Sequence, residues 1–224
     1  MKYLFFIITL CLSITVSSQN TITKNIGEFS TIKVFDLIEV KLIKSTENKI
    51  EISGKNADEV SIVNKNGMLK IRMALDKSFD GSDTFVKVYF NNVNVIDANE
   101  GAFIASEDVF DQIDLTLKSQ EGAQIKLKTD VKFLDVKAVT GGQIELSGKA
   151  DNQIININTG GIYDGKNLES QITKVSIKAG GEAYLKAIES LDVKIRAGGE
   201  VIVYGKPKRI TESKALGGSI KYRD

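Results

Sequence analysis

From about residue 98 onward, apolar and polar residues alternate along the chain, and a doublet of small residues interrupts the alternation at regular intervals. Each doublet is a glycine followed by alanine or glycine, and successive doublets are 21, 19, 19, 20, 18 and 19 residues apart. They are Gly101-Ala102, Gly122-Ala123, Gly141-Gly142, Gly160-Gly161, Gly180-Gly181, Gly198-Gly199 and Gly217-Gly218. Alternation with period two is typical of strands, and a fixed longer period indicates repeated units. The pattern therefore predicts a series of equivalent units built from strands.

Aligning these units on their doublets places apolar residues in columns. The column five residues before each doublet contains Ile96, Leu117, Val136, Ile155, Val175 and Val193. The column three residues after each first glycine contains Ile104, Ile125, Ile144, Tyr163, Ala183, Val201 and Ile220. Units of about 19 residues with no helical stretch predict an all-β fold, a single-stranded parallel β-helix. In such a solenoid each coil pairs with the next, and we expect the aliphatic columns to stack directly above one another.

The doublets themselves have a structural explanation. The alternation continues through each doublet, so its second residue is predicted to face the interior. A side chain larger than a methyl group would push the coil walls apart there, and glycine also permits a positive φ where the chain bends. No helix N-terminus follows to receive a phosphate, so the doublets are not a nucleotide-binding motif.

Residues 26–97 also favour strands, but with less regular spacing. Apolar or alternating runs occur at 29–43, 49–52, 60–63, 68–72 and 85–90. Asn66-Gly67 favours a type I′ turn, which predicts a hairpin between the third and fourth of these runs. We find no linker, and we predict one continuous domain over residues 19–224 with regular coils at 98–224.

The last unit departs from the repeat. Glu212 and Lys214 occupy positions where the columns predict apolar residues. Terminal repeats are expected to be atypical, and charges there discourage stacking between molecules. The strand expected at 219–222 leaves its backbone unpaired, so a homo-oligomer formed through the C-terminal edge is one hypothesis.

Residues 1–18 have the composition of a cleaved signal peptide. Lys2 precedes a mostly apolar run at 3–16, and small residues lead to an expected cleavage before Gln19. A helix of about 14 residues spans only ~21 Å, which is too short for a hydrocarbon core of ~30 Å. Leu10 stands where lipid attachment at Cys11 would need a small residue. We therefore expect an exported protein without a membrane anchor, in the periplasm, at the cell surface or secreted.

Composition narrows the possible chemistry. The chain has no His and no Trp, and its single cysteine lies in the leader. The mature chain therefore has no Ser-His-Asp or Cys-His centre, no disulfide, no histidine or cysteine metal site and no indole platform for sugars. Lys and Arg number 30 against 29 Asp and Glu, with the signs interspersed, which indicates neither a nucleic-acid nor an anionic-lipid partner. We assign no cofactor-binding or metal-binding residues.

The doublets, together with the stretches FSTIKVFDLIEVKLIKSTENKIEISGK and NGMLKIRM, carry a resemblance to a known family. From about Glu28 to Tyr222 the chain resembles the family of exported Bacteroidetes proteins called putative auto-transporter adhesin, head GIN domain. The resemblance implies a right-handed parallel β-helix in the cell envelope or outside the cell, and it implies no catalytic residues.

Two carboxylates are the best candidates for catalysis. Glu100 and Glu121 each precede a doublet in successive units, so one strand spacing of about 5 Å should separate them. Such a pair would suit a retaining glycosidase, in which one carboxylate raises the pKa of the other. The same column continues with Thr140, Thr159, Ala179, Ala197 and Leu216, which is equally what a partly exposed edge would contain. A polysaccharide lyase or glycosidase is therefore the alternative hypothesis, and we assign no catalytic residue.

The main hypothesis is a non-enzymatic, adhesin-like or cell-envelope interaction module. A rigid solenoid presents flat faces of repeated polar side chains, which suit contacts with a surface glycan, a protein or an envelope polymer. One possible face is the ladder of Lys118, Lys137, Asn156, Ser176 and Lys194.

Overall fold

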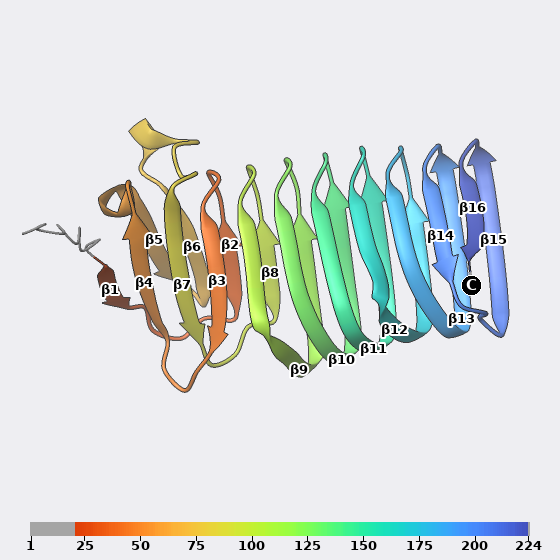
Figure 1. Cartoon of the computed structure of the whole chain (residues 1–224), viewed down its shortest axis with the longest axis horizontal. Coiled ribbons are helices and arrows are strands. Elements are labelled where there is room, and N and C mark those ends of the chain that lie inside the picture. The colour runs from red at the N-terminus through yellow and green to blue at the C-terminus, as the bar shows by residue number, and fades with distance from the viewer. Residues whose placement is uncertain (1–20, 224) are drawn as a thin grey trace, which may run out of the picture.

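The fold is a stack of β-coils along one long axis (Figure 1). The computed structural model describes residues 21–223, whose strands form one 16-stranded sheet. The first eight strands are β1 (Ile22–Asn25), β2 (Thr31–Val34), β3 (Glu39–Lys44), β4 (Lys49–Gly54), β5 (Val60–Lys65), β6 (Met68–Met73), β7 (Thr84–Phe90) and β8 (Val95–Ala98). The others are β9 (Phe103–Ser119), β10 (Gln124–Val139), β11 (Gln143–Asn158), β12 (Ile162–Ile177), β13 (Glu182–Ala197), β14 (Glu200–Tyr204), β15 (Arg209–Leu216) and β16 (Ser219–Arg223). The two short 3-10 helices are Ala57–Glu59 and Leu75–Lys77.

Two strand layers enclose the core. Wall A contains, in order along the axis, β1, β4, β7, β3, the first halves of β9 to β13, β14 and β16. Wall B contains β5, β6, β2, β8, the second halves of β9 to β13, and β15. Each long strand serves both walls: β9, for example, pairs with β3 through Phe103 and with β8 through Thr116. One coil is therefore a wall A strand, a bend, a wall B strand and a tight turn.

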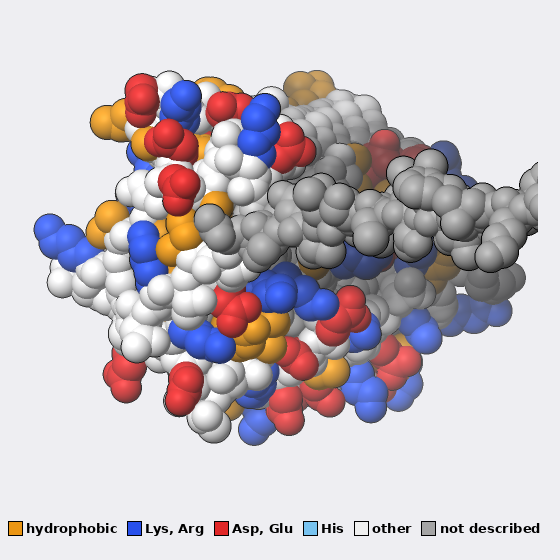
Figure 2. Space-filling model, turned by 60° about the vertical axis from the view of Figure 1, so that its left-hand side comes forward, with side chains coloured by type: hydrophobic (Ala, Val, Ile, Leu, Met, Phe, Trp, Pro, Cys, Tyr) orange, Lys and Arg blue, Asp and Glu red, His pale blue; other side chains and the backbone are white. Residues whose placement is uncertain are grey.

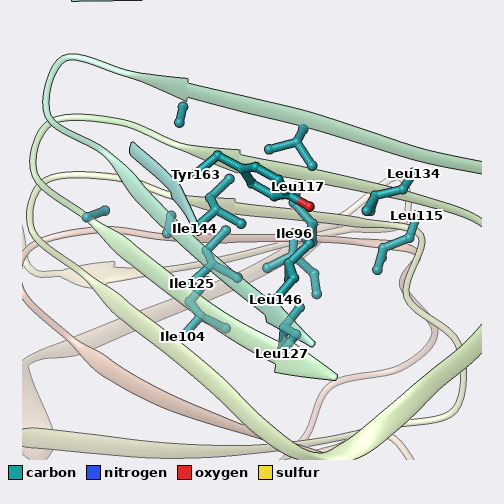
Figure 3. Packing of buried hydrophobic residues seen from close by; sticks show 14 of the residues in the cluster. Ile96, Ile104, Leu115, Leu117, Ile125, Leu127, Leu134, Ile144, Leu146 and Tyr163 are labelled. Carbon is teal, nitrogen blue, oxygen red and sulfur yellow. The ribbon is translucent and has the colours of Figure 1, made fainter. Parts of the chain in front are cut away.

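The predicted stacking of aliphatic side chains is confirmed. Val136 pairs with Ile155, Ile155 with Val175, and Val175 with Val193, all in parallel register. Ile104, Ile125, Ile144 and Tyr163 form the facing column in wall A, and Figure 3 shows them in a row opposite Ile96 and Leu117. All of these side chains are at most 1% exposed. Burial of each aliphatic side chain in these columns stabilises the fold by about 1.5–3 kcal/mol, but only because neighbouring coils cover it.

The N-terminal strands form coils as well, but not in chain order. β2 pairs with β6 on one side and β8 on the other, and β3 likewise lies between β7 and β9. The coil made by β6 and β7 thus lies outside the coil made by β2 and β3, although it follows in sequence. The predicted hairpin is confirmed, because β5 and β6 are antiparallel around Asn66 and Gly67, whose φ values are 52° and 73°. Antiparallel β1, β4 and β5 then close this end of the stack.

The doublet turns connect wall B to wall A in two conformations. In the four turns at Gly101, Gly122, Gly141 and Gly160, the glycine and the residue before it have φ between 49° and 73°. This is the type I′ pattern, in which both central residues are left-handed. In the last three doublets both glycines have positive φ, for example 62° at Gly180 and 112° at Gly181. Glycine is favoured at these corners because L side chains rarely adopt such angles.

The second doublet residue faces the interior, as predicted. Ala102 and Ala123 are 0% exposed, which shows that a methyl group fits in the first two of these turns. A Cβ at Gly142 would lie 2.1 Å from the carbonyl oxygen of Ser119, and one at Gly161 would lie 2.2 Å from that of Ala138. At Gly142 and Gly161 the backbone of the preceding coil fills the space, so even a methyl group does not fit there.

The C-terminal end of the stack is open. All eight residues of β15 are exposed, including Glu212 and Lys214, which continue the core columns of Val193 and Ile195. The atypical last coil predicted from the sequence is thus present. The predicted signal peptide, residues 1–18, lies outside the described residues. Over residues 21–223 no helix has the length and hydropathy needed to cross a bilayer.

Candidate functional site

The two candidate carboxylates lie on the narrow edge of the solenoid where the doublet turns stack. The N–H of Gly101 donates to the carbonyl oxygen of Glu121 at 2.9 Å, so Glu100 and Glu121 occupy neighbouring turns, as predicted. The N–H of Leu37 donates to the carbonyl oxygen of Glu100 at 2.9 Å in the same way. Asp36 and Leu37 are therefore a further turn of this column, with φ values of 60° and 62° and no glycine. The edge carries three successive acidic residues rather than two.

Asp36 has a clear structural task. It is 1% exposed, and its two carboxylate oxygens accept hydrogen bonds from the backbone N–H of Met73 at 3.0 Å and of Phe79 at 3.1 Å. Arg72 Nε lies 3.9 Å from Asp36 Oδ2. This carboxylate therefore holds the connection between β6 and β7 against the turn of the next coil.

The surroundings of Glu100 change its acidity. Burial raises its pKa above the usual carboxyl value, and repulsion and hydrogen bonding from Asp36 and repulsion from Glu121 add to the rise. Glu121 itself is exposed. Five surface hollows over residues 21–223 are lined by residues other than these two carboxylates. Among the described residues, no group of three or more acidic side chains is arranged to hold a metal ion.

The predicted polar ladder is continuous on the outer face of wall B. Lys118 pairs with Lys137, Lys137 with Asn156, Asn156 with Ser176, and Ser176 with Lys194. Lys194 Nζ lies 3.5 Å from Asp192 Oδ2. The lining of a shallow hollow of about 120 Å³ includes this pair together with Ile154 and Lys174. Figure 2 shows the N-terminal end of the molecule, where acidic and basic side chains are intermingled rather than gathered by sign. The ladder itself combines three lysines with one asparagine and one serine.

The sequence did not point to a larger groove on the outer face of wall A. It has a volume of about 380 Å³ and lies across β11 to β14, the teal to blue strands of Figure 1. Its lining includes Gln143, Glu145, Ile162, Lys166, Tyr184 and Tyr204. Ile202 lies beside Tyr184 in the neighbouring strand and is only 3% exposed, although its neighbours Val201 and Val203 point into the core. Ile162 and the rings of Tyr184 and Tyr204 therefore place apolar surface beside the charged side chains that line this groove.

The spacing of the tyrosines along the sequence does not locate this groove. Tyrosines recur at 163, 184, 204 and 222, close to the coil period. Tyr163 is nevertheless 0% exposed, whereas Tyr184 and Tyr204 reach the surface. Tyr163 pairs with Ala183, whereas Tyr184 pairs with Asp164, so the two tyrosines are one residue out of register and face opposite sides of the sheet.

The C-terminal edge is exposed, as the self-association hypothesis requires. β16 pairs with β14 on one side, and β15 pairs with β13. Inside this last coil the hydroxyl of Tyr222 donates to Glu212 Oε1 at 2.6 Å. Burial raises the pKa of Tyr222, and the hydrogen bond to Glu212 adds to the rise.

Comparison with solved structures shows the same fold in three Bacteroidetes proteins. A putative adhesin from Bacteroides fragilis superposes with a TM-score of 0.83 at 18% identity, covering 92% of this chain and 98% of that one. A putative adhesin from Parabacteroides merdae gives 0.72 at 16% identity, covering 93% and 98%. A putative lipid binding protein from Parabacteroides distasonis gives 0.71 at 16% identity, with the same coverage. At these identities the likeness establishes the fold alone.

Sequence comparison adds the family. No curated protein matches the chain. A family model described as "Putative auto-transporter adhesin, head GIN domain" matches residues 28–207, which include strands β2 to β14 and all but the last of the doublet turns. The chain therefore belongs to the head GIN domain family of putative auto-transporter adhesins.

Proposed function

We propose that this chain is an exported, non-enzymatic, adhesin-like module that binds a partner through the outer faces of its solenoid. The observation that carries the proposal is the two-walled stack itself, in which strand pairing fixes the spacing of outward side chains over many coils. A surface held in this way loses little conformational entropy on binding, so many weak contacts add up. Membership of an adhesin-named family and adhesin-named neighbours support the same role.

An adhesion assay tests this proposal. Beads coated with residues 19–224 should adhere to bacterial or host cells more strongly than beads coated with the same protein after irreversible unfolding. The Glu100→Gln, Glu121→Gln double variant should adhere as well as the wild type, because the proposal gives these carboxylates no chemical role. Equal adhesion of folded and unfolded protein on every surface tried would contradict the proposal.

The enzyme alternative makes a different prediction, and the raised pKa of Glu100 next to Glu121 is the observation in its favour. A glycosidase or lyase should release reducing ends or unsaturated products from a bacterial or host polysaccharide. Release of such products by the wild type, with none from the double variant, would replace the binding proposal with catalysis.

Export and self-association are the remaining parts of the proposal. Mass spectrometry of the protein recovered outside the cytoplasm should show a chain that begins at Gln19; recovery of a chain that begins at Met1 would contradict export with cleavage. The open edge formed by β15 and β16 offers unpaired backbone groups to a second copy. Light scattering should detect a dimer at high concentration, and a monomer at every concentration would count against self-association.

A further inference from the structure

The groove on wall A has the composition of a binding site rather than of an ordinary polar face. Its volume of about 380 Å³ lies within the range of small-ligand pockets. Tyr184 and Tyr204 supply flat rings, Ile162 supplies an aliphatic contact, and Gln143 and Lys166 supply hydrogen-bonding groups at its margin. Sites for polar organic ligands combine such apolar surfaces with a few placed polar groups.

Hydrogen bonding holds Tyr184 in place. Its hydroxyl donates to Glu182 Oε2 at 2.6 Å. This bond, with burial and the charge of Glu182, raises the pKa of Tyr184 to about 12, so the hydroxyl keeps its proton at neutral pH. The ring is half-buried between strands and therefore loses little freedom when a ligand packs on its exposed face.

Most carboxylates around the groove are neutralised by lysines. Lys166 Nζ is 2.7 Å from Asp164 Oδ2, and Lys126 Nζ is 3.0 Å from Glu145 Oε1. Glu200 is paired with Lys221 and accepts a hydrogen bond from Ser219 Oγ at 2.8 Å. An anionic ligand would meet these carboxylates, and a cationic ligand would have to compete with lysines already in place. The arrangement therefore favours a ligand without net charge.

We propose that this groove binds an uncharged oligosaccharide, with sugar rings packed on Tyr184 and Tyr204 and hydroxyls hydrogen-bonded to Gln143 and the paired carboxylates. Sugars have one apolar face of C–H groups and a rim of hydroxyls, which matches two tyrosine rings bordered by acceptors and donors. The inference rests on the proposed binding function and specifies its ligand class and its place on the fold.

Binding to an array of oligosaccharides tests the inference, with residues 19–224 as the probe. The array should include uncharged, sialylated and sulfated members, with cationic peptides as a separate arm. We expect binding to uncharged members. For the strongest of these, Tyr184→Ala and Tyr204→Ala should each raise Kd about tenfold or more, because each removes an aromatic contact.

Tyr89→Ala is the matched control. Tyr89 is also half-buried on wall A, and its hydroxyl also donates to a glutamate, Glu51 Oε2, at 3.1 Å. It lies in β7, far from the groove along the axis. This variant should bind like the wild type while losing a similar tyrosine–glutamate bond. If an alanine variant fails to fold, Tyr184→Phe should keep most of the affinity, and Gln143→Arg, at an exposed margin position, should weaken it.

Three results would overturn the inference: no uncharged saccharide binds, only charged glycans or cationic peptides bind, or the groove variants bind like Tyr89→Ala. Cell adhesion separates this failure from failure of the proposed function. Adhesion by the wild type together with a silent array would remove the oligosaccharide inference alone, whereas loss of both would remove both.

Discussion

The two ends of the solenoid terminate the aliphatic core columns differently. One core column runs from Leu69 in β6 through Ile32, Ile96 and Leu117 to Val193, and it ends at Glu212 in β15. Leu69 is 0% exposed because antiparallel β5 and the connection after β6 continue beyond it. Glu212 has no such cover and is exposed.

The difference shows that an aliphatic column needs a neighbour on both sides, and that a chain can end it by capping or by changing the residue. Capping at the N-terminal end uses strands of reversed direction, which cover the last parallel coil. At the C-terminal end, the charged side chains of Glu212 and Lys214 are instead solvated by water on the uncovered coil. The N-terminal end is therefore closed to further coils, whereas the C-terminal end is not.

The largest expected effect on stability comes from exchanging the residues that end the same core column at Leu69 and Glu212. Leu69→Glu places a carboxylate where the side chain is fully buried, and we expect a loss of more than about 4 kcal/mol from lost burial and charge desolvation. Thermal melting should show a fall in Tm of about 10 °C or more, or no folded protein. Glu212→Leu should leave Tm unchanged or higher and should increase self-association by light scattering. Equal destabilisation by the two variants would contradict the comparison.

A smaller effect on the free energy of unfolding is expected at Asp36 and Leu216, which lie in the first and last of the stacked tight turns. Asp36→Ala removes the acceptor of two backbone hydrogen bonds at a buried site, which should cost about 2 to 4 kcal/mol. Leu216 occupies the corresponding turn position in the last coil and is 78% exposed, so Leu216→Ala should change stability by less than about 0.5 kcal/mol. Urea unfolding measures both. A negligible loss in Asp36→Ala would show that the loop after β6 does not depend on this carboxylate.

The smallest effect concerns pH and distinguishes the acidic N-terminal turns from the apolar C-terminal ones. The folded-state pKa of Glu100 is raised by burial first and by Asp36 and Glu121 next. The stability associated with its protonated form is therefore complete below the unfolded pKa and is lost as pH rises through the folded value.

Glu100→Gln, which carries no charge, should accordingly raise Tm at pH 7 by about 1 to 3 °C. The difference from wild type should shrink as pH falls through the folded-state pKa of Glu100, and it should be absent below the unfolded value of about 4.3. A stabilisation of Glu100→Gln that grows with acidity would mean that the direction of the shift is wrong.

The regular half of the fold could be predicted because its signals are local. Period-two alternation and doublets about 19 residues apart appear directly in the sequence, and together they define which residues stack. The order of the N-terminal coils could not be predicted, because β6 and β7 have the same alternation wherever they pair. The Asp36-Leu37 turn was missed because a leucine with φ of 62° occupies the glycine position of the other turns.

Contacts across the core were equally beyond the sequence. Tyr163 stands in a column of isoleucines, and its hydroxyl donates to Gln153 Oε1 at 2.7 Å from the opposite wall. Gln153 in turn donates to Ser170 and Thr173, each at 2.9 Å. The pairing of these residues depends on how far the two walls lie apart. For the same reason the groove with Tyr184 and Tyr204 became evident only in three dimensions, while the positions of Glu100 and Glu121 followed from the repeat alone.

The central claim is that each doublet marks the same point on successive stacked coils. Engineered cysteine pairs test this claim most directly. Asn156 pairs with Lys137 in the adjacent coil, and Lys118 lies one coil further away. A Lys137→Cys, Asn156→Cys chain should form an intramolecular disulfide on mild oxidation, which peptide mapping detects by mass. A Lys118→Cys, Asn156→Cys chain should not, because two strand spacings of about 4.8 Å exceed the reach of a disulfide. A bond in the second chain and none in the first would contradict the account.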